Sequence, residues 1–283
     1  MNLERGGIFM GNSILENYID KKADRYADRV NAEFCQTENS NIRKILDLYS
    51  NPEQSGSDTP SHAKVTSRLM AIMVDAVNAK HPGTFTEQQK QSVVVASMLH
   101  DVGKTAIPVS ILDKPGRPTP EEFDHIKTHT VVGNRIIGKW LESKNMSEGQ
   151  KEMLTFAQQM ACYHHERPDG NGYPLGLSGE EIPYVAKMMA VVDVMEALTA
   201  ERAYKTPMPF EKAESIIREG AGKQFDAELV DIFFSNEKTR GEINRIIEDG
   251  RIEKMNMQIA EKEEVNTDNH SNEIINSNIE EER

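Results

Sequence analysis

The stretch TEQQKQSVVVASMLHDVGK, Thr86–Lys104, decides the fold class of this chain. Its SVVVA portion, taken alone, would suit a buried β-strand. The residues before it favour a helix, because Thr86 and Gln89 have the spacing of a capping box, in which two side chains satisfy free backbone N–H groups at a helix start. The apolar run continues to His100, and Gly103 follows as a stop signal. We therefore predict a helix here and not a strand.

Other segments carry the same kind of signal. Thr119 with Glu122, and Ser147 with Gln150, repeat the capping-box spacing, and Gly220 ends a short helical run. Helices are expected over residues 60–80, 119–141, 147–165, 182–200 and 209–219. The middle of the chain is therefore predicted to be all-α.

The two ends of the chain differ from this middle part. Residues 1–56 contain weak amphipathic helices and are too short for a second domain with a large core. From residue 236 onward the sequence becomes polar and acidic, so residues 236–283 are expected to be a flexible or partly helical tail. The folded domain is placed at residues 57–235.

The composition argues against several classes of partner and location. The 283 residues carry a formal net charge of -13, which argues against long nucleic acids as partners because these are bound mainly by Lys and Arg. Two cysteines, Cys35 and Cys162, are too few for a disulfide framework, so a cytoplasmic location is expected. Cys162 suits a small apolar residue of a buried helical face better than a metal ligand. A membrane is not expected as a partner, because the chain has neither an apolar run near 18 residues nor a secretory signal pattern.

Histidines are distributed unevenly along the chain. Of eight, His81, His125 and His270 have no surroundings that suggest a metal site. The other five have acidic or histidine neighbours: His62, His100, His129, His164 and His165.

Several of these residues stand at spacings that suit metal ligation. Asp58 and His62 are four residues apart, which places both on one helical face. Adjacent residues such as His100 and Asp101 point in different directions, so the pair suits two neighbouring ions with the carboxylate between them. Asp193 lies in an otherwise apolar helix, where a carboxylate is costly unless it is paired or bound to metal.

Each feature has a simpler explanation. A single histidine on a helix is more often a core or surface residue, and Asp193 could cap a neighbouring helix. The joint pattern is much harder to produce by chance. Imidazoles with carboxylates suit Fe, Mn, Zn or Ni, whereas a structural zinc site would favour thiolate pairs.

The ordered motifs resemble those of a known family. An HD pair, a later His, an HH pair and then Asp is the ligand order of the HD superfamily of metal-dependent phosphohydrolases. HHERPDGNGYP, LHDVGKTAIPVSILDKPG and ALTAERAYK resemble its HD-GYP subfamily, from about Asp58 to Phe234. The resemblance implies an HD-domain helical bundle with HD-GYP C-terminal extension helices.

The resemblance also implies an activity and a site. HD-GYP proteins hydrolyse cyclic dinucleotides, chiefly cyclic di-GMP, to linear pGpG or GMP at two or three metal ions, often iron or manganese. Lys104 would contact the scissile phosphate, Arg202 and Lys205 would hold phosphate or guanine, and Tyr173 would lie beside the substrate. Asp101 would bridge two ions, and the full ligand set would be Asp58, His62, His100, Asp101, His129, His164, His165 and Asp193.

A mechanism follows from the charges of such a site. Two ions that share a water lower its pKa from 15.7 toward about 7, and the hydroxide then attacks phosphorus in line. Lys104 would add positive charge, although it could instead be an exposed cation after a helix end. Gly170 and Gly172 permit the tight turn that would bring Tyr173 over the histidine pair.

Some positions depart from the family pattern. Pro168 stands where an aromatic residue is usual, Glu196 where Asp is usual, and Lys64 where Arg is common. Asp58 replaces the Glu of three-metal members, so the third ion is in question. A hydrolase of cyclic GMP-AMP or another nucleotide, and a silent cyclic-dinucleotide sensor, are the alternatives. Metal identity, product, regulation, and dimerisation or a signalling partner stay open.

Overall fold

In this computed structural model the chain is helical, which confirms the all-α prediction. The structure describes residues 59–144, 146–201 and 206–256. Two isolated bridges, Asp169 with Ser178 and Ala221 with Phe225, are the β pairing recorded within these ranges. The helices are α4 (Thr59–Lys80), α5 (Glu87–Ser97), α6 (Val109–Leu112), α7 (Pro120–Lys127), α8 (His129–Leu141), α9 (Glu148–Tyr163), α10 (Tyr184–Thr199), α11 (Phe210–Glu219) and α12 (Ala227–Phe233), with 3₁₀ turns η1 (Val102–Ala106) and η2 (Gly179–Glu181).

The helix starts follow the capping signals of the sequence. Thr86, Thr119 and Ser147 each accept a hydrogen bond from the backbone N–H three residues later, and the Glu or Gln there bonds back. The predicted helix over 119–141 is interrupted, however. Thr128 breaks it into α7 and α8, because its N–H and its hydroxyl both bond to the His125 carbonyl. The break places His129 in the first turn of a new helix.

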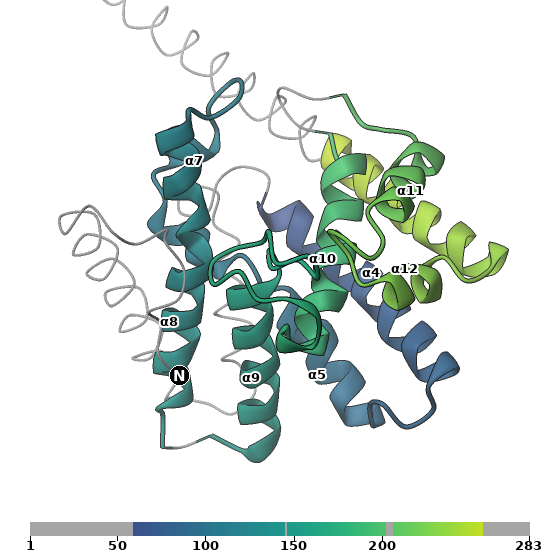
Figure 1. Ribbon diagram of the computed structural model, residues 1–283, viewed down its shortest axis with the longest axis horizontal. Helices are drawn as coiled ribbons and strands as arrows, with labels where there is room; N and C mark the ends of the chain where they lie inside the picture. Colours follow the sequence, from purple (N-terminus) through teal and green to yellow (C-terminus); the bar gives the residue numbers. More distant parts are fainter. Residues whose placement is uncertain (1–58, 145, 202–205, 257–283) are drawn as a thin grey trace, which may run out of the picture.

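The core lies between α4, α5, α8, α9 and α10. Helix α9 packs against α8 on one side and α5 on the other, and α4 packs against α5, α10 and α12. Figure 1 shows α8 and α9 side by side, with α10 and α4 next to them and α11 and α12 at the far side. Fully buried side chains from several of these helices fill the space between them, among them Leu69, Met73, Trp140, Leu154 and Met189.

The beginning of the polar C-terminal segment is helical and packs on the core. Residues 237–256 form a helix, and its side chains Ile243, Ile246 and Ile247 are buried in the main core. The same helix brings Gly250 against Val65 of α4. The apolar stripe of one helix face is thus enough to hold a segment that is polar on average. The packed unit reaches at least residue 256; the N-terminal segment 1–56 lies outside the described residues.

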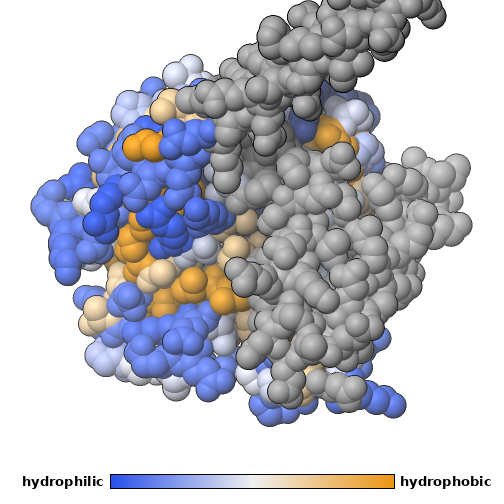
Figure 2. Space-filling model, turned by 180° about the vertical axis from the view of Figure 1, so that it is seen from behind, coloured by the Kyte–Doolittle hydropathy of each residue, from blue (hydrophilic) through white to orange (hydrophobic). Residues whose placement is uncertain are grey.

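The outer surface has mixed polarity. On the side opposite to that of Figure 1, hydrophobic side chains gather in a strip between hydrophilic margins (Figure 2). None of the helices described here has the length and apolar character that a membrane crossing requires.

Candidate metal centre

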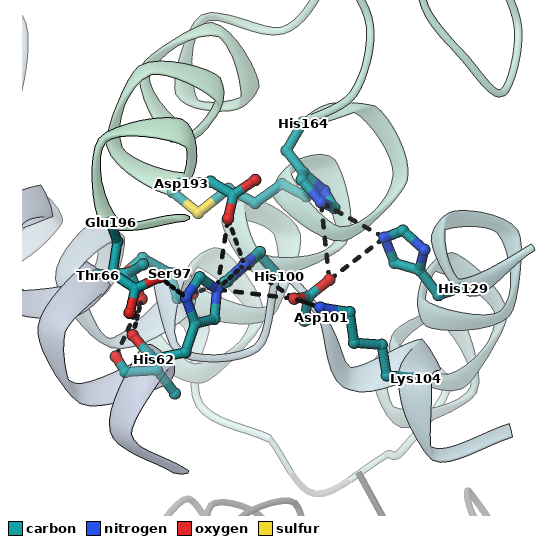
Figure 3. Close-up of polar contacts among 12 residues, drawn as sticks. His62, Thr66, Ser97, His100, Asp101, Lys104, His129, His164, Asp193 and Glu196 are labelled. Atoms are coloured by element: carbon teal, nitrogen blue, oxygen red, sulfur yellow. Dashed lines mark hydrogen bonds and ion pairs between the residues drawn. The ribbon is translucent and has the colours of Figure 1, made fainter. Parts of the chain in front are cut away.

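Five elements carry the expected ligands to one place in the core. His62 is the fourth residue of α4, and His100 and Asp101 follow the end of α5. His129 begins α8, His164 caps the end of α9, and Asp193 lies in α10. Figure 3 shows these side chains pointing toward one another. The convergence that the sequence pattern predicts is therefore present.

Hydrogen bonds to the outer ring nitrogen orient four of the imidazoles. Nδ1 of His100 lies 2.7 Å from the Ser97 carbonyl, and Nδ1 of His129 lies 2.7 Å from the Ile126 carbonyl. Nδ1 of His164 contacts the Met160 carbonyl at 2.8 Å. A carbonyl can only accept, so each Nδ1 carries a proton, and Nε2 is the ring nitrogen that faces the centre. This is the orientation that metal-bound histidines commonly have.

The fourth imidazole is oriented by a carboxylate. Nδ1 of His62 lies 2.5 Å from Oε2 of Glu196, one turn after Asp193 on α10. Both side chains are buried. A carboxylate that accepts from Nδ1 fixes the tautomer and makes Nε2 a stronger ligand. Glu196 stands where the HD-GYP pattern usually has Asp. Its carboxylate orients His62 and does not itself face the centre.

The ligand atoms form two groups of three. Within each group, atoms that can bind a metal lie within 4.8 Å of one another. One group consists of His62, His100 and Asp101, and the other consists of His129, His164 and His165. The adjacent pair His164–His165 thus contributes two imidazoles to one group, whereas the HD pair serves the other.

Asp101 lies between the two groups. Its Oδ1 is 3.3 Å from Nε2 of His129 and 3.8 Å from Nε2 of His164. Its Oδ2 is 3.4 Å from Nε2 of His100 and 3.7 Å from Nε2 of His62. The two oxygens of one carboxylate thus face different histidine groups, which is the geometry expected of a bridging ligand.

Asp193 adds a second carboxylate beside the first group. Its Oδ1 is 3.4 Å from Nε2 of His62 and 3.8 Å from Nε2 of His100. Burial acts to raise the pKa of Asp193, but His100 and His62 outweigh it and hold the pKa below its usual range. The carboxylate is therefore ionised and available as a ligand at neutral pH.

The donor set fits divalent cations. Nε2 of His62 lies 3.0 Å from Nε2 of His100, so two lone pairs face each other unless a proton or a cation lies between them. Oδ1 of Asp101 is buried and lacks a hydrogen-bond partner among the described residues. Converging lone pairs and an orphaned anionic oxygen are costly in a protein interior and favourable around a metal ion.

The histidine groups differ electrostatically. Burial lowers the pKa of His129 and of His164, and it lowers the pKa of His165 to about 3, so these imidazoles are neutral near pH 7. Burial acts in the same direction on His100, but the carboxylates of Asp101 and Asp193 raise its pKa to about 10. Neutral imidazole is the form that binds metal.

Lys104 and Tyr173 both lie at the centre. Nζ of Lys104 is 2.5 Å from Oδ2 of Asp101, at the partly exposed edge of the site. The ring of Tyr173 stacks on His165, with 4.6 Å between ring centroids. Lys104 is therefore placed to offer positive charge beside the bridging carboxylate, and Tyr173 covers the second histidine group.

The loop that carries Tyr173 is closed by contacts that the sequence motif does not reveal. Buried Glu166 accepts hydrogen bonds from the backbone N–H groups of Leu175 at 2.6 Å and Leu177 at 2.9 Å. A Cβ at Gly172 would lie 2.5 Å from the Glu166 Cα and 2.6 Å from the His165 oxygen. Gly170 has the positive φ, 75°, that the predicted tight turn needs. Gly172 does not have a positive φ, and is instead required for close approach of two backbone segments.

Gly103 has a similar steric role. A Cβ there would lie 1.9 Å from the backbone oxygen of His129 and 2.6 Å from the Gly133 nitrogen. The contact sets the distance between η1 and α8, and with it the distance between Asp101 and His129. Sequence reasoning treats Gly103 as a helix stop and does not detect this contact.

A cavity of about 400 Å³ opens beside the second histidine group. His164, His165 and Tyr173 line its inner end. Its other walls include Phe123 and Lys127 of α7, Ala190 and Val194 of α10, and Gln224 and Phe225 before α12. Its volume lies in the range of about 300–1,000 Å³ that is usual for small-molecule sites.

Three of the expected site residues lie outside the described residues: Asp58, Arg202 and Lys205.

Comparison with known proteins agrees with this geometry. Residues 57–229 match the HD domain family, and the chain belongs to that family. The chain is 35% identical over 196 residues to a probable cyclic di-GMP phosphodiesterase of Vibrio cholerae. The matched region covers 69% of this chain and 44% of the relative. The resemblance to HD-GYP proteins seen in the motifs is thereby confirmed.

Two further relatives have related names. A cyclic di-GMP phosphodiesterase of Thermotoga maritima is 41% identical over 150 residues, 53% of this chain and 38% of the relative. A 3'3'-cGAMP-specific phosphodiesterase 2 of Vibrio cholerae is 30% identical over 201 residues, 69% of this chain and 37% of the relative. The chain spans less than half the length of each of these relatives.

Proposed function

We propose that this protein is a metal-dependent phosphodiesterase that hydrolyses a cyclic dinucleotide, with cyclic di-GMP as the leading substrate and linear pGpG, GMP or both as products. The observation that carries the proposal is the position of Asp101, whose two oxygens face two separate histidine groups. The names of the relatives support the substrate class.

The positions of the donor atoms define the proposed ligand set. His62, His100 and Asp193 would hold one ion, and His129, His164 and His165 would hold a second, with Asp101 bridging them. Iron or manganese is the proposed metal, since imidazole and carboxylate donors suit both. Divalent ions bound there would supply an activated water at neutral pH and would offset negative charge on the phosphate.

The protein's own side chains would position the substrate. The Lys104 ammonium would leave Asp101, or be shared with it, to pair with an oxygen of the scissile phosphate, which adds electrostatic stabilisation as charge develops there. Tyr173 would form the wall beside the scissile group, because its ring already covers His165. Burial raises the pKa of the Tyr173 hydroxyl, so it would stay protonated and could donate a hydrogen bond.

Several wider assignments are proposals of the same kind. The catalytic domain would comprise residues 57–235 together with the packed helix 237–256, in a cytoplasmic protein. Residues 1–56 would have a separate role, in packing or dimerisation. Asp58 would decide whether a third ion binds, and Arg202 and Lys205 would hold phosphate or guanine.

Cyclic GMP-AMP is the second candidate substrate, because one relative is named as a phosphodiesterase specific for 3'3'-cGAMP. Purified protein loaded with iron or manganese should be incubated with cyclic di-GMP and with cyclic GMP-AMP, and the products should be separated. Linear dinucleotide or mononucleotide is expected, faster with cyclic di-GMP. Binding of either compound without turnover in every metal would point to a silent sensor and overturn the proposal.

A further inference from the structure

We infer that α7 supplies a second part of the substrate site: Phe123 stacks one nucleobase of the cyclic dinucleotide, and Lys127 pairs with the phosphate that is not being cleaved. This inference rests on the proposed function. It assigns a binding role to two residues that lie outside the metal centre and outside the motifs of the sequence.

Phe123 is exposed at the rim of the cavity. The residue is 45% exposed, which makes it one of the few large apolar residues of the described ranges that face solvent. It is not isolated, because it lines the cavity whose inner end is formed by His165 and Tyr173. An aromatic face at the rim of a nucleotide-sized cavity is suited to base stacking, which is tolerant of base identity.

The Lys127 ammonium lies beside the Phe123 ring. Phe123 and Lys127 are four residues apart on α7, so they lie on one face of the helix. Nζ of Lys127 is 5.0 Å from the centroid of the Phe123 ring, and both residues line the same cavity. The cation's ion-pair partner is the exposed carboxylate of Asp124 at 2.6 Å, a contact that water screens and that an anionic ligand can displace.

The charge of the ligand also requires a cation outside the metal centre. A cyclic dinucleotide has two phosphates, and the metal centre can neutralise the one that is cleaved. Lys104 already lies against Asp101, on the side of the centre itself. Lys127 and Arg167 are the cations that line the cavity leading away from His164 and His165, and Arg167 is already held by both carboxylate oxygens of Asp169, at 3.0 and 2.6 Å. The second phosphate would therefore meet Lys127, while the adjacent base covers Phe123.

The test separates dinucleotide binding from chemistry. Phe123→Ala and Lys127→Ala are compared with wild type on cyclic di-GMP and on bis(p-nitrophenyl) phosphate, a diester with one phosphate and no nucleobase. We expect KM for cyclic di-GMP to rise about fivefold to 100-fold for Phe123→Ala and about tenfold for Lys127→Ala. Turnover of the small diester should stay within about twofold of wild type, because neither side chain touches the centre.

Lys151→Ala is the matched control. Lys151 also forms an exposed i,i+3 ion pair, with Glu148 at 2.7 Å, but it lies at the far end of α9. The KM of Lys151→Ala for cyclic di-GMP should equal that of wild type. An unchanged KM for cyclic di-GMP in both α7 variants would overturn this inference alone. Failure of the wild-type protein to hydrolyse any cyclic dinucleotide would overturn the proposed function and this inference with it.

Discussion

Oε2 of Glu196 lies 2.5 Å from Nδ1 of His62, across 134 positions of sequence. The contact joins α10 to α4 directly behind the metal centre, and both side chains are shielded from water. Nε2 of the same imidazole faces His100 and Asp193. One carboxylate thus sets the direction in which Nε2 of His62, a proposed metal ligand, points.

We predict that Glu196→Ala lowers metal affinity and activity by about 10-fold to 100-fold, the usual effect of removing a partner that orients a ligand. Glu196→Gln should recover part of the loss, since its amide oxygen can still accept from Nδ1. Bound metal per protein and turnover are measured together. Glu219→Ala is the control, because Glu219 is exposed and its contact is with Ser215. Full metal occupancy in Glu196→Ala would contradict the orienting role.

Asp101→Asn should remove activity while the fold is retained. The amide has no charge and only one oxygen, so it cannot serve both histidine groups. The loss of several kcal/mol of electrostatic stabilisation corresponds to roughly a thousandfold or more in turnover. Metal content and circular dichroism are measured alongside turnover, with exposed Asp75→Asn as control. Wild-type metal content and activity in Asp101→Asn would refute the bridging assignment.

Gly103→Ala should damage the centre sterically. The new Cβ would lie 1.9 Å from the His129 oxygen, and backbone atoms cannot rotate away as a side-chain end can. We expect a loss of about 1–3 kcal/mol in the free energy of unfolding, with weaker metal binding as α8 shifts. Gly241→Ala, where a Cβ meets nothing within 4 Å, is the control and should be neutral or stabilising. Equal stability of the two variants would show that α8 adapts.

Most of the residues that converge on the candidate metal centre could be expected from the sequence, because they stand in recognisable local patterns. An HD pair at a helix end, an adjacent histidine pair and an acid in the apolar helix of Asp193 are visible without any knowledge of contacts. Glu196 and Gly103 act through residues far away in the sequence, and Glu166 acts through backbone N–H groups nine and eleven residues later. Nothing in their neighbours marks these roles, so they required the folded structure.

The limits of the fold were harder to predict than its class. Capping boxes mark helix starts directly, as at Thr86 and Ser147, whereas the break at Thr128 arises from hydrogen bonds within a continuous helical pattern. The helix over 237–256 was hidden by its polar average composition. Its signal was the spacing of Ile243, Ile246, Ile247 and Gly250, which are three, four and seven residues apart on one face.

Lys187 gives the stability of the protein a dependence on alkaline pH. The ammonium is buried and contacts Glu180 at 3.1 Å and Asp226 at 3.2 Å. Burial acts to lower the pKa of Lys187, but the two carboxylates outweigh it and raise the pKa above its ordinary value of 10.5. The ion pairs therefore contribute stability fully below about pH 10.5, and this stability is lost as pH rises through the higher folded-state pKa.

Lys187→Met should accordingly cost about 1.5–3 kcal/mol at pH 7, the range for hydrogen bonds to charged groups. The difference from wild type should shrink above about pH 10.5 as the wild-type ammonium loses its proton. Urea unfolding at pH 7 and pH 11 measures both quantities, with the exposed Lys212→Met as control. A difference that stays constant across this range would exclude the ion pairs as its cause.

The helix over 237–256 offers a matched pair of isoleucines that tests whether it belongs to the catalytic core. Ile247 is 3% exposed and Ile252 is 52% exposed on the same helix. Ile247→Ala should cost about 2–5 kcal/mol, because it removes buried methyl groups and leaves a cavity. Ile252→Ala should change the free energy of unfolding by less than about 0.5 kcal/mol. Urea denaturation that finds equal, small effects would mean that this helix is not packed on the core, and the domain would then end near residue 235 as the composition alone suggests.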